Sequence, residues 1–138
     1  MYKRHIAKVL TERLLEPRSF IQIVTGPRQT GKTTAVKQAV QAAGLPHRYA
    51  SADNIIVHPL SWIEVQWQQA RHLASDDIPA VLVLDEIQLI DGWSEVIKRL
   101  WDEDSWYGTN LHVVLLGSTT LLEKGHTGIL TGRFELIR

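Results

Sequence analysis

The sequence contains no cysteine, and this absence excludes both a disulfide framework and a metal site built on thiolates. It also has no excess charge of either sign, because 15 lysine and arginine residues balance 15 aspartate and glutamate residues. The overall charge therefore does not indicate binding to nucleic acid or to anionic lipid. No apolar run approaches the roughly 20 residues that cross a bilayer, and the N-terminus does not read as a signal peptide. A cytoplasmic protein that does not enter the membrane is expected.

Histidine is present but scattered. The six histidines show no H-x-x-x-H pair, so no zinc site is predicted.

Residues 20–43, FIQIVTGPRQTGKTTAVKQAVQAA, are the most informative stretch of the chain. They begin with β-branched and aromatic residues, continue through a glycine-bounded loop and end in helix formers, which predicts a strand, a loop and a helix. Residues 26–33, GPRQTGKT, fit the G-x-x-x-x-G-K-[ST] pattern of the phosphate-binding loop (Walker A). A chance match in a chain this short has a probability on the order of 1% or less from average residue usage. An ordinary glycine turn with a surface lysine is therefore the weaker interpretation.

The order of residues in this loop has a physical reason. Gly26 and Gly31 let the backbone approach an anion and adopt unusual φ values, while the following helix directs its unpaired N–H groups at the same anion. Lys32 is expected to contact the β- and γ-phosphates, and the Thr33 hydroxyl is expected to bind Mg²⁺. The residues predicted to surround the phosphates are Gly26, Pro27, Arg28, Gln29, Thr30, Gly31, Lys32, Thr33 and Thr34.

A second motif (Walker B) follows residues 80–84, AVLVL, a continuous apolar run that is typical of a strand covered on both faces. The run ends in Asp85 and Glu86. Asp85 is expected to hold Mg²⁺ mostly through water, because this cation keeps much of its hydration shell. Glu86 is expected to polarise the attacking water as a base or orienting group. Two acids at a strand exit without chemistry are the alternative, but the phosphate-binding loop upstream favours the functional interpretation.

The other segments are predicted from their apolar periodicity and turn signals. Helices are expected over residues 2–16, 59–74, 93–101 and 119–125, and strands over residues 47–50, 111–116 and 134–137. Ser61 is a candidate N-cap with Glu64 as its capping-box partner. The acidic run 102–104 is interpreted as a solvated helix end, not as a metal cluster. Ser118 follows a strand, so in a parallel sheet its hydroxyl would lie beside the acid pair and sense the γ-phosphate, unless it serves as an N-cap.

With these residues assigned, the chain resembles the AAA+-like prokaryotic ATPases of the AAA domain type 14 family. The similarity covers nearly the whole chain, through GPRQTGKTT, YASADN, WIEVQWQQAR, LVLDEIQLIDGWSEVIKRLWDED, VVLLGSTTLLEKG and TGRFELIR. The resemblance implies an α/β fold, the three-layer αβα sandwich of P-loop NTPases. Its five-stranded parallel sheet would have the order 5-1-4-3-2, with the right-handed crossovers that topology rules also require. Residues 1–138 would form the ATPase core, with residues 1–17 as a leading helix.

The family pattern also implies roles for single residues. It makes Lys32 and Thr33 the phosphate and magnesium residues. It makes Asp85 and Glu86 the acid pair, and Ser118 the first sensor. Arg133 matches the arginine of the family's G-R and stands near the position where AAA+ proteins keep an arginine finger. A structural salt bridge is the alternative for Arg133.

Family members usually continue into a small helical lid and often a further domain, and both are expected to be missing from this chain. The residues and the resemblance together predict a magnesium-dependent ATPase core that acts with an attached or partner domain, in one copy or in a homo-oligomer. ATP is preferred to GTP because no N-K-x-D segment is present. A nucleotide-dependent switch that binds ATP or ADP with little turnover is the alternative. A phosphoryl transferase would need an arginine-rich lid, which the sequence does not show.

Overall fold

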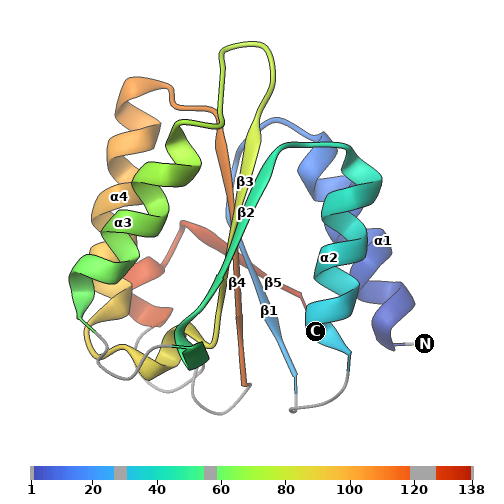
Figure 1. Ribbon diagram of the computed structural model, residues 1–138, viewed down its shortest axis with the longest axis horizontal. Helices are drawn as coiled ribbons and strands as arrows, with labels where there is room; N and C mark the ends of the chain where they lie inside the picture. The colour runs from blue at the N-terminus through green and yellow to red at the C-terminus, as the bar shows by residue number, and fades with distance from the viewer. Residues whose placement is uncertain (1, 27–30, 55–58, 119–126, 138) are drawn as a thin grey trace.

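A five-stranded parallel sheet lies at the centre of the computed structural model, which describes residues 2–26, 31–54, 59–118 and 127–137 (Figure 1). Its strands are β1 (Ile21–Thr25), β2 (His47–Ser51), β3 (Ala80–Asp85), β4 (Leu111–Gly117) and β5 (Phe134–Ile137). They lie in the order β2-β3-β4-β1-β5, and all neighbouring pairs are parallel. This order is the predicted 5-1-4-3-2 read from the opposite edge, so the predicted topology is confirmed.

Helices cover both faces of the sheet. The α-helices are α1 (Tyr2–Leu15), α2 (Lys32–Ala43), α3 (Leu60–Arg71) and α4 (Trp93–Tyr107), and the short 3-10 helices are η1 (Ala52–Asn54), η2 (Ile87–Leu89) and η3 (Thr127–Leu130). Figure 1 shows α1 and α2 on one face and α3 and α4 on the other. The predicted three-layer αβα sandwich is therefore confirmed. None of the helices in the described ranges is long and apolar enough to span a membrane.

Strand β3 shows why the sequence has a continuous apolar run at this place. Leu82 and Leu84 pack into the cluster under α3 and α4, whereas Val81 and Val83 pack into the cluster under α1 and α2. Successive side chains of a strand point to opposite faces, so a strand buried on both sides needs apolar residues at every position. By the same alternation, the next residue, Asp85, belongs to the face covered by α1 and α2.

Helix α4 is longer than predicted, and its acidic run is not a solvated end. Asp104 is only 1% exposed, its carboxylate accepts a hydrogen bond from Trp67 Nε1 at 2.8 Å, and it pairs with Arg71 Nε at 2.8 Å. A buried charge needs such partners. Burial still raises the pKa of Asp104 above its ordinary value. The interpretation as a solvated helix end was therefore wrong for Asp104, because it ignored partners on α3, while Asp102 and Glu103 remain partly exposed.

The predicted N-cap of α3, Ser61 with Glu64, was also wrong. The helix begins at Leu60, Pro59 occupies the N-cap position, and no side chain caps the first turn within the described residues. Glu64 forms an ion pair with Arg99 on α4 instead of a capping box with Ser61. The helix predicted over residues 119–125 lies outside the described residues.

Candidate functional site

The carboxyl ends of the three central strands lie side by side, and this side of the sheet is called its carboxyl edge, as opposed to the amino edge where the strands begin. Thr25 at the end of β1 pairs with Gly117 at the end of β4, and Asp85 at the end of β3 pairs with Leu116. Ser118 follows β4 directly and is half-buried. In open α/β sheets, ligands bind outside the carboxyl ends of the strands. The structure therefore brings the residues after β1, β3 and β4 to the edge where a ligand is expected.

The phosphate-binding loop connects β1 with α2 at this edge. Gly26 follows β1 and is buried, while Gly31 has a φ of 85°, which a residue with a side chain rarely adopts. Gly31 is also the N-cap of α2, and no side chain of the described residues caps this helix end. The first N–H groups of α2 therefore remain as donors for an anion. The predicted contacts Pro27, Arg28, Gln29 and Thr30 lie outside the described residues.

The first turn of α2 carries the next predicted residues. Lys32 is buried, Thr33 is half-buried and Thr34 is exposed. The Thr33 hydroxyl donates a hydrogen bond to Asp85 Oδ2 at 3.1 Å, across 52 residues of sequence. This contact joins the phosphate-binding loop to the second motif.

Asp85 has one carboxylate oxygen left for a ligand. Its side chain is buried, with only 6% of the residue exposed, and Oδ1 has no hydrogen-bond partner within the described part of the chain. A buried carboxylate oxygen without a donor is unfavourable unless something fills that role. Carboxylate, hydroxyl and water oxygens are the ligands that Mg²⁺ prefers. Asp85 and Thr33 together therefore fit a magnesium ion.

Tyr49 on β2 completes the surroundings of Asp85, and the sequence analysis did not identify it. Its hydroxyl donates to Asp85 Oδ2 at 2.5 Å, which is in the range of hydrogen bonds to a charged oxygen. The ammonium of Lys37 lies 4.6 Å from the centre of the Tyr49 ring. Burial and the Asp85 carboxylate raise the pKa of Tyr49 above its ordinary value. The register of β2 against β3, in which Ser51 pairs with Asp85, brings Tyr49 to this position. This register cannot be predicted from the sequence pattern.

Glu86 has the most unusual backbone in the described ranges. With a φ of 56°, it is the one non-glycine residue there with a positive φ. Its N–H donates to the Leu116 carbonyl at 2.9 Å, and its carboxylate accepts a hydrogen bond from Gln88 Nε2 at 2.7 Å. A left-handed non-glycine residue costs on the order of 1–3 kcal/mol and persists where the surroundings impose it. The turn from β3 into η2 thus holds a buried carboxylate directly after Asp85.

Arg133 lies at the amino edge of the sheet, where the strands begin. It precedes β5, and its carbonyl accepts a hydrogen bond from the N–H of Ile21 at the start of β1. Its guanidinium forms two contacts with Asp102, Nε to Oδ1 at 2.7 Å and Nη2 to Oδ2 at 3.0 Å. The guanidinium lowers the pKa of Asp102. The structure therefore does not bring Arg133 to the other predicted site residues of its own chain, and it forms the salt bridge that the sequence analysis kept as the alternative.

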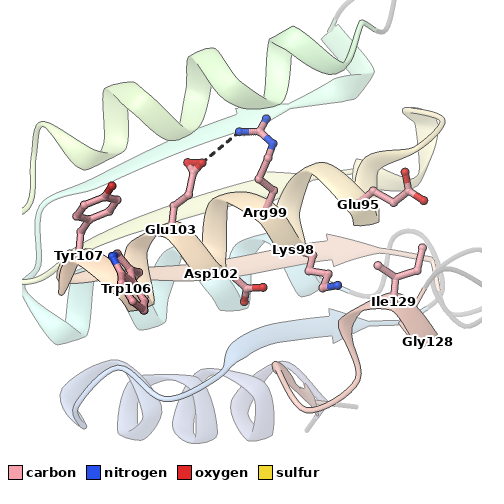
Figure 2. Close-up of a pocket in the computed structure, with 9 residues that line it drawn as sticks. All are labelled: Glu95, Lys98, Arg99, Asp102, Glu103, Trp106, Tyr107, Gly128 and Ile129. Carbon is pink, nitrogen blue, oxygen red and sulfur yellow. Dashed lines mark hydrogen bonds and ion pairs between the residues drawn. The ribbon is translucent and has the colours of Figure 1, made fainter.

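A pocket of about 950 Å³ runs along α4 from Glu95 to Tyr107, next to Gly128 and Ile129 of η3 (Figure 2). It is lined by Glu95, Lys98, Arg99, Asp102, Glu103, Trp106, Tyr107, Gly128 and Ile129. Figure 2 shows Arg99 pointing to Glu103, and the two side chains form an ion pair at 3.3 Å. Asp102 forms an ion pair with Arg133. Arg99, Glu103 and Asp102 in this pocket thus each have a partner of opposite charge.

Comparison with known proteins gives a match over most of the chain. Residues 18–138 match a family described as AAA domain. The chain is also 26% identical over 132 residues to an uncharacterized protein of Haemophilus influenzae, in an alignment that covers 86% of this chain and 30% of that protein. The chain therefore spans 30% of the length of this curated relative.

Proposed function

Because this chain belongs to the AAA domain family, which it matches over residues 18–138, we propose that it binds ATP with Mg²⁺ at the carboxyl edge of its sheet and hydrolyses it. The contact that best supports this proposal is the hydrogen bond from Thr33 to the buried carboxylate of Asp85. It joins the helix that follows the phosphate-binding loop to the strand that carries the acid pair. Apolar packing of α2 against the sheet alone would not require a hydroxyl and a carboxylate to meet at this position.

Binding depends on groups that point at the phosphates. The backbone N–H groups at the start of α2 would donate to the phosphate oxygens, and the Lys32 ammonium would neutralise the β- and γ-phosphates. Thr33 Oγ1 and the Asp85 carboxylate would hold the metal ion, Asp85 through Oδ1, which has no partner among the described residues. When bound, Mg²⁺ neutralises the charge on the β- and γ-phosphate oxygens.

Hydrolysis depends on positioning more than on covalent chemistry. The carboxylate of Glu86 accepts a hydrogen bond from the attacking water, orients it in line with the bond between the β- and γ-phosphates and takes up its proton. The Ser118 hydroxyl donates to the γ-phosphate from the neighbouring strand. The products are ADP and inorganic phosphate. The strained backbone of Glu86 supports this role, because such strain is typically kept at functional sites.

A nucleotide-dependent switch with little turnover is the second candidate function. The placement of Arg133 favours it, because this arginine pairs with Asp102 at the amino edge and not with groups at the carboxyl edge. An arginine finger contributes on the order of 10³–10⁵ in rate to related phosphoryl transfers. If Arg133 acts as a finger, it acts on a neighbouring copy. A single copy without this contribution would bind nucleotide well and hydrolyse it slowly.

The substitution Glu86→Gln separates the two functions, measured by multiple-turnover phosphate release with ATP and Mg²⁺. We expect the rate to fall by about 10²–10⁴, the usual contribution of a general base, with ATP affinity retained. Glu95→Gln is the matched control, because Glu95 is exposed on α4 and loses the same charge. A rate that Glu86→Gln leaves unchanged contradicts the assignment of hydrolysis. If the unsubstituted protein binds ATP without any turnover, the result would support the second function, a nucleotide-dependent switch.

A further inference from the structure

We propose that Tyr49 is a positioning residue for the magnesium ion, holding the Asp85 carboxylate in the orientation that receives the metal's water shell. This inference rests on the proposed function, because it assumes that Mg²⁺ binds beside Asp85 with the nucleotide. It assigns a role to a strand that carries neither of the two nucleotide motifs. Tyr49 contacts a residue of the site and does not contact the reacting atoms.

The geometry around Asp85 is asymmetric. Tyr49 donates to Oδ2 at 2.5 Å and Thr33 donates to the same oxygen at 3.1 Å, whereas Oδ1 is buried and has no partner among the described residues. The terminal torsion of an aspartate is broad, so the carboxylate plane is not fixed by the backbone. Two donors on one oxygen fix that plane. They leave the second oxygen for a ligand that brings its own hydrogen atoms, as a metal-bound water does.

The ring of Tyr49 is itself held in place. It packs against the apolar cluster under α1 and α2, and the Lys37 ammonium lies 4.6 Å from its centre. Lys37 is four residues after Thr33 on α2, so both side chains lie on the same face of that helix. Tyr49 therefore connects the helix that carries the metal-binding hydroxyl with the strand that carries the metal-binding carboxylate. Removing its hydroxyl alone leaves this packing intact.

Tyr49→Phe tests the proposal, with Tyr107→Phe as the matched control, because Tyr107 is 79% exposed on α4. The affinity for Mg²⁺ is measured by calorimetric titration of the protein saturated with a non-hydrolysable ATP analogue. Partners that orient a metal ligand contribute about 10–100-fold to metal affinity. We expect Tyr49→Phe to weaken Mg²⁺ binding about 10-fold or more, and Tyr107→Phe to leave it unchanged. Affinity for the analogue in the presence of a chelator should be the same in all three proteins.

A second readout separates positioning from mere stabilisation of the fold. At saturating Mg²⁺, the turnover rate of Tyr49→Phe should return to within about 2-fold of the unsubstituted rate, so the loss appears in the Mg²⁺ concentration required and not in kcat. Lys37→Met retains the hydroxyl and loosens only the ring, so we expect it to weaken Mg²⁺ binding by a smaller factor. It provides the test if Tyr49→Phe does not fold.

Two results would overturn the proposal. Equal Mg²⁺ affinity in Tyr49→Phe would show that the hydroxyl only satisfies a buried carboxylate. Tighter affinity would show that the hydroxyl competes with the metal. If the unsubstituted protein binds neither the analogue nor Mg²⁺, the proposed function fails and this inference fails with it. Normal binding by the unsubstituted protein with no effect of Tyr49→Phe contradicts the inference alone.

Discussion

The two edges of the sheet differ in whether a buried carboxylate has a cationic partner from the chain itself. Toward the amino edge, both oxygens of Asp104 have partners, Trp67 on Oδ2 and Arg71 on Oδ1. At the carboxyl edge, Asp85 receives two neutral donors on Oδ2, and its Oδ1 has none within the described residues. A buried carboxylate that is neutralised by the chain's own cation serves the fold. One that is left without a cation is suited to a cation from outside.

The same contrast holds for the arginine and the backbone. Arg133 is engaged by Asp102 near the amino edge, where it contributes to the packing of α4 against the start of β5. At the carboxyl edge, Glu86 keeps a left-handed backbone and Gly31 leaves the start of α2 without a side-chain cap. Asp104 and Arg133 therefore have charged or polar partners toward the amino edge, whereas the carboxyl edge keeps the strained backbone of Glu86 and an Asp85 Oδ1 without a partner among the described residues, which a nucleotide and a metal would complete.

The largest expected effect on stability is at Asp104. Asp104→Asn should lower the free energy of unfolding by about 3–5 kcal/mol, because it leaves Arg71 without its buried partner. Urea unfolding monitored by far-UV circular dichroism measures this loss. The substitution should leave ATP affinity unchanged. Asp77→Asn is the control, since Asp77 is exposed in a loop. Loss of ATP affinity in a folded Asp104→Asn protein would break the contrast between the two edges.

His112 gives an expected effect of similar size that depends on pH. Burial lowers its pKa from the ordinary value of 6.5 to about 4, and His112 is 5% exposed near the start of β4. The unfolded chain therefore takes up the proton at a higher pH than the folded chain. Stability is fully present above about pH 6.5 and is lost as the pH falls toward 4, by about 3 kcal/mol in total.

Urea unfolding at a series of pH values measures this loss. In His112→Gln, the part of the slope between pH 6.5 and 4 that belongs to His112 should disappear. If the pH dependence is the same with and without His112, the histidine is not buried in its neutral form.

Asp85→Asn should have a smaller effect on stability and a selective effect on metal binding. The amide keeps an oxygen for Thr33 and Tyr49, and it removes a buried charge that no cation of the described residues balances. We expect the free energy of unfolding to change by less than about 1 kcal/mol, or to rise. Calorimetry should show Mg²⁺ binding to the nucleotide-loaded protein weakened by about 10–100-fold. A large loss of stability without loss of Mg²⁺ affinity would make Asp85 equivalent to Asp104.

The sequence predicted the features that depend on local pattern. The strand, loop and helix around Gly26 and Gly31 are visible because glycine spacing and apolar periodicity are local properties. The apolar run before Asp85 predicts a strand buried on both faces, and a parallel sheet then delivers the acid to the ligand edge. The strand order followed from the family resemblance and was confirmed.

Features that depend on contacts between distant segments could not be predicted in this way. Tyr49 reaches Asp85 only because β2 and β3 pair in one particular register, and a shift by one residue would turn it to the other face. Asp104 is buried because α3 supplies Trp67 and Arg71 at matching heights. Neither contact can be recognised from the residues that neighbour Tyr49 or Asp104 in the sequence.

The most direct measurement is calorimetric titration of the protein with ATP and Mg²⁺, compared with the variant Lys32→Ala. Lys32 belongs to the phosphate-binding loop motif, so its loss should abolish measurable binding while far-UV circular dichroism stays unchanged. We expect clear binding to the unsubstituted protein and none to the variant. Equal affinity in the two proteins, or no binding to the unsubstituted protein, would contradict the claim that the carboxyl edge of the sheet is a nucleotide site.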